Sequence, residues 1–488
     1  MEPPEAYPPS LSSRLQRRRW RLRGFTLAAA CKQQARTIRV PHQHARSRSC
    51  VAAMTNRSAA SAKLAHSQPK AIFQIANFYR ACERRLSSSQ KTPELLTNNC
   101  LPILPRQSYS GTAMESGTKH VKGLNGLRAL AVILVFLSHK AHLASVDAGK
   151  LGVWIFFFIS GFLIVGELHR NRTGIEHGMQ DCRTVIAVFF AKRALRIFPV
   201  YYLLLAALAI AHRLFYQRGV DLGIVWHFVF LSNLWIGVVK RMWPGTVSHF
   251  WSLAVEQQFY LVAPFTLVLT RAKRHLRMCA AFVLVCAALH LALYAAGANS
   301  PLIYAFSPWN FALLALGGMC SMASADPRVA AHMRRTSWLA AGLAGTCVFA
   351  SQPLCAADAG PLALGWIDLG LSVSLCCFFL YVVNRQDSVL VTVLETPALD
   401  YLGTISYGFY LIHNLIPSKL GAAPALYARM HLPTELQQAL PAVLQFLLSL
   451  LLAHLSWRLL EKRVLALKKP VEAELKRRMR APAQPQPY

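Results

Sequence analysis

Long apolar segments recur through most of this chain, and they leave few folds open to it. Of its 488 residues, 54% are hydrophobic and 15% are charged. From Leu124 onward the apolar segments approach the ~20 residues with which a helix crosses the hydrocarbon core of a membrane. Lipid offers no partner to an open backbone, so such segments must be helices. We therefore expect an all-α, polytopic transmembrane helical bundle, with candidate segments at 124–142, 151–168, 197–212, 222–239, 250–270, 278–297, 306–324, 337–356, 363–383, 402–417 and 436–459.

The positions of Lys and Arg predict how these segments are oriented. If all of them crossed, the basic loop 271–277 would be external, against the rule that basic loops are cytoplasmic. Treating 222–239 as a segment that does not cross removes the conflict, because the basic loops and the basic C-terminal end then share one side. The sequence thus predicts about ten spanning helices with cytoplasmic N and C termini, and an external or re-entrant segment at 213–249.

Basic residues are concentrated at the start of the chain. Residues 1–113 hold 19 Lys and Arg against 4 Asp and Glu, are rich in Ser, Pro and Gln, and contain no apolar segment of spanning length. This composition is typical of disorder. We hypothesise that translation begins at Met114, in preference to an organellar transit peptide. We accordingly expect a basic, disordered extension over 1–113, a membrane domain over 114–465 and a basic cytoplasmic tail over 466–488.

Several functional classes are disfavoured by the sequence. The net charge of +32 follows from basic loops and the basic extension, and no module of interleaved basic and aromatic residues indicates nucleic-acid binding. The 12 cysteines form no CxxC pair, and His227, His249 and His290 lack metal-ligand spacing, so we predict no metal site and treat these histidines as structural. Nucleotide-binding and hydrolase motifs are also missing from the sequence.

Two polar residues on the first apolar segment point to function. Arg128 and His139 lie eleven residues apart, which places them on one face of a helix, roughly 16 Å apart along its axis. Ionisable groups inside a membrane are costly and usually functional. In the predicted orientation Arg128 lies near the cytoplasmic end and His139 in the outer half.

A second pair of arginines precedes the third predicted helix. Arg193 and Arg196 stand three residues apart and therefore share a face, just before Pro199. Together with Arg128 they can bind phosphate groups, because guanidinium forms paired hydrogen bonds to phosphate oxygens. Taken alone, the pair is more typical of basic anchors at a cytoplasmic helix end.

Glu256 and His413 are predicted to reach the same outer depth as His139. Glu256 lies in a helix that enters from the outer side, and His413 lies about eleven residues into a helix that runs outward. A carboxylate beside an imidazole can orient it and raise its basicity, as a general base requires. Each residue alone could instead be a buried hydrogen-bonding group that holds helices together.

Five motifs, in order, resemble those of the acyltransferase family 3 integral membrane proteins, which O-acylate cell-surface polysaccharides, lipopolysaccharide and related glycans. The motifs are GLNGLRALAVILVFLSH, GVWIFFFISGFLI, RALRIFP, FWSLAVEQQFYL and ISYGFYLIH, and the likeness covers roughly residues 118–465. The resemblance implies ten helices, in agreement with the orientation analysis. It also implies acyl-CoA, presented from the cytoplasm, as the donor.

The resemblance also assigns roles to residues. The family's arginine and histidine of the first helix correspond to Arg128 and His139, its paired arginines to Arg193 and Arg196, its WSLxxE glutamate to Glu256 and its late histidine to His413. Trp154 and Gln257 depart from the family, which often has Asp and Glu at these places, so acceptor specificity can differ.

Our hypothesis from the sequence is an integral membrane O-acyltransferase of the bacterial inner membrane. Arg128, Arg193 and Arg196 hold the phosphates of acyl-CoA, and His139, oriented by Glu256, removes a proton from a glycan hydroxyl. Acetyl-CoA is the expected donor, and no permanently bound cofactor is expected. Direct transfer and an acyl-histidine intermediate both remain open. The alternatives are a polysaccharide or lipid-carrier transporter or flippase, and an acyltransferase for a small metabolite.

Overall fold

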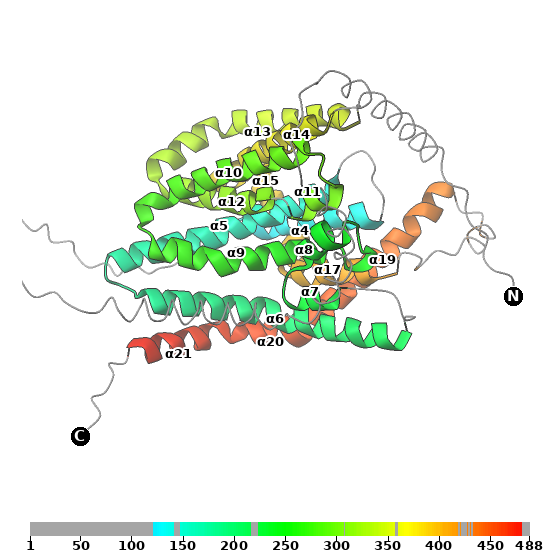
Figure 1. The fold of residues 1–488 in the computed structure, drawn as a ribbon, viewed down its shortest axis with the longest axis horizontal. Coiled ribbons are helices and arrows are strands. Elements are labelled where there is room, and N and C mark those ends of the chain that lie inside the picture. Colours follow the sequence, from blue (N-terminus) through cyan, green and yellow to red (C-terminus); the bar gives the residue numbers. More distant parts are fainter. Residues whose placement is uncertain are drawn as a thin grey trace, which may run out of the picture. The chain divides into compact units, whose positions relative to one another are not determined.

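The computed structural model describes residues 121–140, 147–215, 223–306, 308–356, 360–417, 420, 427, 430 and 433–480, and their regular elements are all helical (Figure 1). The predicted extension over 1–113 and the start at Met114 lie outside these residues.

The elements, in chain order, are α4 (Leu124–Lys140), α5 (Ala148–Glu176), α6 (Cys182–Phe215), α7 (Ile224–Phe228), α8 (Ser232–Leu234), π-helix η3 (Trp235–Lys240), 3-10 helix η4 (Gly245–Val247), α9 (Phe250–Leu269), 3-10 helix η5 (Ala272–Arg274), α10 (His275–Ala295), α11 (Ser300–Phe306), α12 (Pro308–Ala325), α13 (Pro327–Ala356), α14 (Pro361–Asn384), α15 (Val389–Leu394), α16 (Pro397–Thr404), α17 (Ser406–Ile412), 3-10 helix η6 (His413–Leu415), α19 (Thr434–Ser456), π-helix η7 (Trp457–Glu461), α20 (Lys462–Ala466) and α21 (Lys468–Arg480).

The helices have the length and hydropathy of a membrane protein, as the sequence predicted. In the described residues, seven helical segments are long and apolar enough to cross a bilayer, at Ala148–Glu176, Cys182–Leu214, Gly245–Leu269, Ala272–Ala295, Ser300–Ala325, Pro361–Asn384 and Ala439–Met479. Helix α4 has 17 residues and packs along α5. The total of about ten spanning helices and the cytoplasmic termini stay predictions.

The apolar segment 222–239 is not one helix, which agrees with the prediction that it does not cross. It is divided into α7, α8 and η3, and Phe230, between α7 and α8, has a positive φ of 55°. Side chains tie this segment to the spanning helices: Tyr201 donates to the carbonyl of His227, at 2.8 Å, and the Asn233 and Gln258 amides pair at 2.8 and 3.1 Å.

The segment 402–417, predicted as one apolar helix, is divided as well. Helix α16 ends at Thr404, α17 spans only Ser406–Ile412, and η6 follows. A side chain at Gly403 would place its Cβ 1.9 Å from the carbonyl oxygen of Asn125, so α16 crosses α4 in backbone contact. The short α17 ends inside the helical assembly, beside the residues predicted to be catalytic.

Helix α5 is the centre of the packing, since it contacts α4, α9 and α12 and lies between α9 and α12 in Figure 1. Its contact with α12 depends on two glycines. A Cβ at Gly161 would lie 1.8 Å from the Leu314 carbonyl oxygen, and a Cβ at Gly317 would lie 2.2 Å from that of Phe158. No larger residue fits without moving the helices apart.

The C-terminal end of the chain is also helical over part of the predicted tail. Helix α21 packs along α6 (Figure 1), and its Glu472 accepts a 2.9 Å ion pair from Lys192. The Lys192 ammonium lies 3.5 Å from Glu167 of α5 as well. Residues 468–480 are thus attached to the helical assembly by charge.

The glycine contact between α5 and α12 can be tested by stability. Replacing Gly161 with Ala should destabilise the protein by about 1–3 kcal/mol, because the added methyl group meets backbone that cannot yield. The matched control is Gly370→Ala, also within a helix, where no atom lies within 4 Å of the new Cβ. Thermal unfolding in detergent should show a lower Tm for the first variant alone, and equal Tm values would contradict the packing argument.

Candidate functional site

One cavity collects the arginines that the sequence singled out. It lies between α4, α5, α6, α9 and α17, and its empty volume is about 810 Å³, open solvent at its mouth included. Arg128, Arg193, Arg196 and Glu256 all line it. Three guanidinium groups against one carboxylate leave the lining with a positive balance, which favours an anionic ligand.

The arginines are placed by side-chain contacts to neighbouring helices. The Arg128 guanidinium donates to the Asn125 side chain at 3.0 Å. Arg193 forms a 3.0 Å ion pair with Glu167, and its guanidinium carbon lies 5.5 Å from the ring centroid of Phe189. The buried Nε of Arg193 has no hydrogen-bond partner among the described residues. It is therefore a donor that an anion can satisfy.

Glu256 belongs to this arginine-lined cavity. The groups that act on its carboxylate are Ser160, Tyr260, Arg193 and Arg196. The sequence hypothesis placed Glu256 beside His139 as the group that orients it, whereas the described contacts place it opposite the arginines. Spacing along one helix indicates which face a residue occupies, but not which helix lies opposite.

His139 instead contacts the other predicted histidine. Its Nδ1 lies 3.0 Å from Nε2 of His413. His413 is fully buried, and the ring of Phe409 stacks on it, with centroids 6.2 Å apart and an interplanar angle of 11°. The structure thus brings together residues that lie 274 positions apart in the sequence.

A third histidine, which the sequence indicated as structural, joins this pair. The ring centroid of His249 lies 5.1 Å from that of His413 and 6.5 Å from that of His139. Its Nε2 lies 3.1 Å from the carbonyl oxygen of Leu411. The available signal was its position directly before the FWSLAVEQQFYL motif. We call His139, His249 and His413 the histidine cluster.

Tyr410 connects the cavity with the histidine cluster. Tyr410 and Ser252 line the cavity and share a 2.6 Å hydrogen bond between their hydroxyls. The Tyr410 hydroxyl also donates to the backbone carbonyl of His249. The backbone carbonyl oxygen of Tyr410 lies 2.7 Å from Nδ1 of His413. The cavity therefore has an arginine end and an end that adjoins the histidine cluster through Tyr410, which we call the histidine end.

The length of the cavity can be measured along α5, which lines it. Its lining residues on this helix run from Val153 to Ile164, eleven positions or roughly 16 Å along the axis. Gly149, near the first of these, lies against Ser138 of α4, because a Cβ there would be 2.7 Å from the Ser138 hydroxyl. The histidine end is thus the end at which α5 begins and α4 ends.

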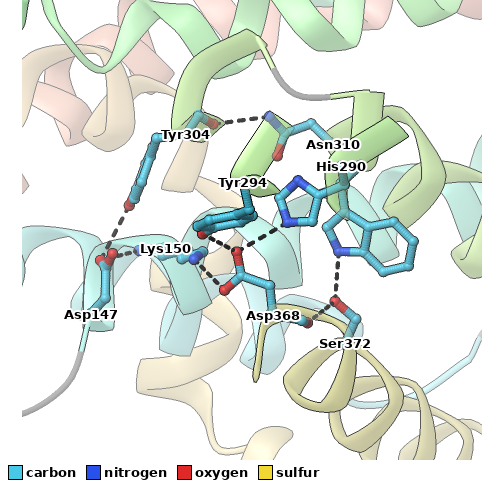
Figure 2. A network of polar contacts seen from close by, with 9 residues as sticks. Asp147, Lys150, His290, Tyr294, Tyr304, Asn310, Asp368 and Ser372 are labelled. Carbon is cyan, nitrogen blue, oxygen red and sulfur yellow. Dashed lines mark hydrogen bonds and ion pairs between the residues drawn. The ribbon is translucent and has the colours of Figure 1, made fainter. Parts of the chain in front are cut away.

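A separate buried network lies around Asp368 (Figure 2). The Asp368 carboxylate pairs with the Lys150 ammonium, and accepts hydrogen bonds from His290 at 3.1 Å and from the Tyr294 hydroxyl at 2.8 Å. The Trp309 indole donates to Ser372 at 2.9 Å, and Ser372 donates to the Asp368 carbonyl at 2.8 Å. The network joins α5, α10, α12 and α14, which is a structural role. In the described part of the chain, no three or more metal-ligating side chains gather to hold an ion.

The Asp368 network predicts a large loss of stability in Asp368→Ala. The substitution removes a buried carboxylate that pairs with the partly exposed Lys150 ammonium and accepts hydrogen bonds from His290 and Tyr294, which costs about 3–5 kcal/mol. Asp387→Ala is the control, since Asp387 is exposed in the turn that follows α14 and a surface change is worth about 0.5 kcal/mol or less. Thermal unfolding in detergent should separate the two variants, and a wild-type Tm for Asp368→Ala would refute the assignment.

The chain is similar to known O-acetyltransferases. Residues 121–457 match the model of the acyltransferase 3 family, which is described as an acyltransferase domain. The chain is 27% identical over 363 residues to the peptidoglycan O-acetyltransferase OatA of Listeria monocytogenes, and 25% identical over 374 residues to the putative peptidoglycan O-acetyltransferase YrhL of Bacillus subtilis. Each alignment covers 70% of this chain and 55% of the relative.

A shorter alignment, 31% identical over 170 residues, relates the chain to a putative O-acetyltransferase of Staphylococcus aureus, and covers 32% of this chain and 27% of the relative. The chain thus spans about half the length of the first two relatives that it matches. No solved structure matches it.

Proposed function

Because this chain belongs to the acyltransferase 3 family, we propose that it moves an acetyl group from acetyl-CoA to a sugar hydroxyl of a cell-surface or lipid-linked glycan. The observation that carries this proposal is the cavity itself: its arginine end suits phosphates, and its other end adjoins an imidazole pair. The two ends match the two parts of an acyl-CoA, which are a polyanionic nucleotide and a distant thioester.

The arginines are the proposed site for the donor. Arg128, Arg193 and Arg196 supply planar groups that bind phosphate oxygens in pairs, and Glu256 offsets part of their positive charge. With the predicted orientation, the arginine end opens toward the cytoplasm, where acyl-CoA is made. The roughly 16 Å of lining along α5 suits an extended arm that carries the thioester to the histidines.

His139 is the proposed general base. The hydroxyl oxygen of the acceptor attacks the thioester carbonyl carbon while His139 takes the hydroxyl proton. The tetrahedral intermediate then expels the CoA thiolate by breaking the carbon–sulfur bond, and the imidazolium returns the proton to the sulfur. His139 is only half-buried, so an acceptor can reach it, whereas His413 is fully enclosed. An acyl-histidine intermediate is the alternative course of the same reaction.

A glycan acceptor is supported by the relatives. Two of them are named peptidoglycan O-acetyltransferases, and we propose an acceptor of the same chemical class for this chain. We place the protein in the bacterial cytoplasmic membrane, where CoA and glycan precursors meet at one enzyme. Membrane lipid surrounds the helices, and nucleic acid has no part in the reaction.

The role of His139 is tested by His139→Ala. The variant should lose about 10²–10⁴-fold in the rate of acetyl transfer, as expected when a general base is removed, with unchanged membrane insertion. The assay uses membrane vesicles, acetyl-CoA labelled in the acetyl group, thiol release, and NMR of the glycan. His332→Ala, at an exposed position of α13, is the control. Transfer at the wild-type rate by His139→Ala would overturn the assignment, and glycan movement without thiol release would indicate a flippase instead.

The donor site is tested by Arg196→Gln. Loss of a charged hydrogen-bond donor to phosphate is worth about 1.5–3 kcal/mol, so the KM for acetyl-CoA should rise roughly 10-fold to 100-fold while kcat changes less. Arg274→Gln, an exposed basic residue next to α10, should leave KM unchanged. A drop in kcat with a wild-type KM would show that Arg196 does not bind the donor.

A further inference from the structure

We propose that the C-terminal end of α17 sets the tautomer of His413 and, through it, the tautomer of His139, so that His139 presents an unprotonated Nε2 to the acceptor. His413 is then a positioning residue, which acts on the acceptor only through His139. This inference rests on the proposed function of His139 as the base.

The first step concerns the end of the helix. The last carbonyls of a helix have no partner within it and must find one elsewhere. Helix α17 ends at Ile412, and its Tyr410 carbonyl lies 2.7 Å from Nδ1 of His413, while its Leu411 carbonyl lies 3.1 Å from Nε2 of His249. A carbonyl oxygen can only accept a hydrogen bond. The ring nitrogens in these two contacts therefore carry hydrogen.

The second step concerns the charge of His413. Its ring is 0% exposed, and the groups that act on it electrostatically are His249, His139, Lys140 and the Tyr410 carbonyl. None of these carries a negative charge, and a buried cation without a counter-ion is costly. His413 is therefore neutral with its single hydrogen on Nδ1, and its Nε2 is a hydrogen-bond acceptor.

The third step concerns the tautomer of His139, which follows from that of His413. Nε2 of His413 lies 3.0 Å from Nδ1 of His139, and since the first atom accepts, the second must donate. His139 then carries its hydrogen on Nδ1 and a lone pair on Nε2. When that Nε2 takes the acceptor's proton, the positive charge is held by the hydrogen bond to His413. No proton moves between the two rings, and His413 keeps its Nδ1 hydrogen throughout.

The remaining members of the cluster hold the rings in position. Phe409 stacks on His413, and His249 meets its ring nearly edge-on, with centroids 5.1 Å apart and an interplanar angle of 65°. The Tyr410 hydroxyl bonds to the His249 carbonyl at 2.9 Å. These contacts fix the His413 ring against α17, which is what a tautomer-setting residue requires.

The two positions of a histidine ring can be mimicked separately by amides. In His413→Gln the amide reaches the place of Nε2, where its oxygen can accept from His139. In His413→Asn the amide reaches only the place of Nδ1, where it can donate to Tyr410 but leaves His139 without a partner. We expect His413→Gln to keep kcat within about tenfold of wild type, and His413→Asn and His413→Leu to lose about 10²–10⁴-fold, as when a catalytic imidazole loses the group that fixes its tautomer.

The comparison separates positioning from packing. The KM for acetyl-CoA should stay at the wild-type value in all three variants, and Tm is measured for each. Equal kcat values for the Gln and Asn variants, or kcat values that follow Tm alone, would overturn the tautomer role. If His139→Ala is inactive at the same time, the base assignment stands; an active His139→Ala overturns both proposals.

A second measurement does not depend on His413 variants that fold. In wild-type protein with ¹⁵N-labelled histidine, the side-chain nitrogen shifts report which ring atom carries hydrogen, and the signals of His139 are those lost in His139→Ala. Protonation of Nδ1 and a bare Nε2 at neutral pH are expected. A hydrogen on Nε2 of His139 in the resting protein would refute the proposal.

Discussion

The requirement that each backbone carbonyl find a partner shapes this protein more than any single contact. In lipid, water is not available to complete the end of a helix. Helix α17 nevertheless ends at Ile412, among other helices. Its Tyr410 and Leu411 carbonyls accept hydrogen bonds from the imidazoles of His413 and His249. Buried imidazoles, which are costly inside a membrane, therefore have a structural use at this helix end. The hydrogen bonds that complete α17 also orient the His413 and His249 rings.

A second requirement is that helices approach closely enough to enclose a cavity. Gly161 and Gly317 allow α5 and α12 to touch backbone to backbone, and the Asp368 network ties α5 to α10 and α14. These contacts hold one side of α5, while its other side lines the cavity. The arginine end and the histidine cluster are therefore held at a distance set by one helix.

Much of this was predictable because it depends on local pattern. Apolar length predicted the membrane helices, and ordered motifs indicated the family that the comparisons confirm. Loop charge predicted that 222–239 does not cross, and the structure divides that segment into α7, α8 and η3. Contacts between helices were harder to predict from the sequence. From the sequence we expected Glu256 beside His139, but helix packing places Glu256 opposite arginines. From the sequence we also expected His249 to be a structural residue, whereas its ring lies beside His413. Such partners depend on which helices meet and on where α17 ends, and neither follows from spacing along one segment.

The unequal anchoring of the cavity walls has a consequence for how a ligand enters. Helix α5 cannot shift away from α12 without separating backbones already in contact at Gly161. The cavity is also lined by α6 and by the short α17. A shift of α6 away from α5 would break the ion pairs of Lys192 and Arg193 with Glu167, so the consequence is clearest for a shift of α17. Because Tyr410 lies on α17, such a shift would also move the carbonyl that holds His413, which couples the shape of the cavity to the position of the imidazole.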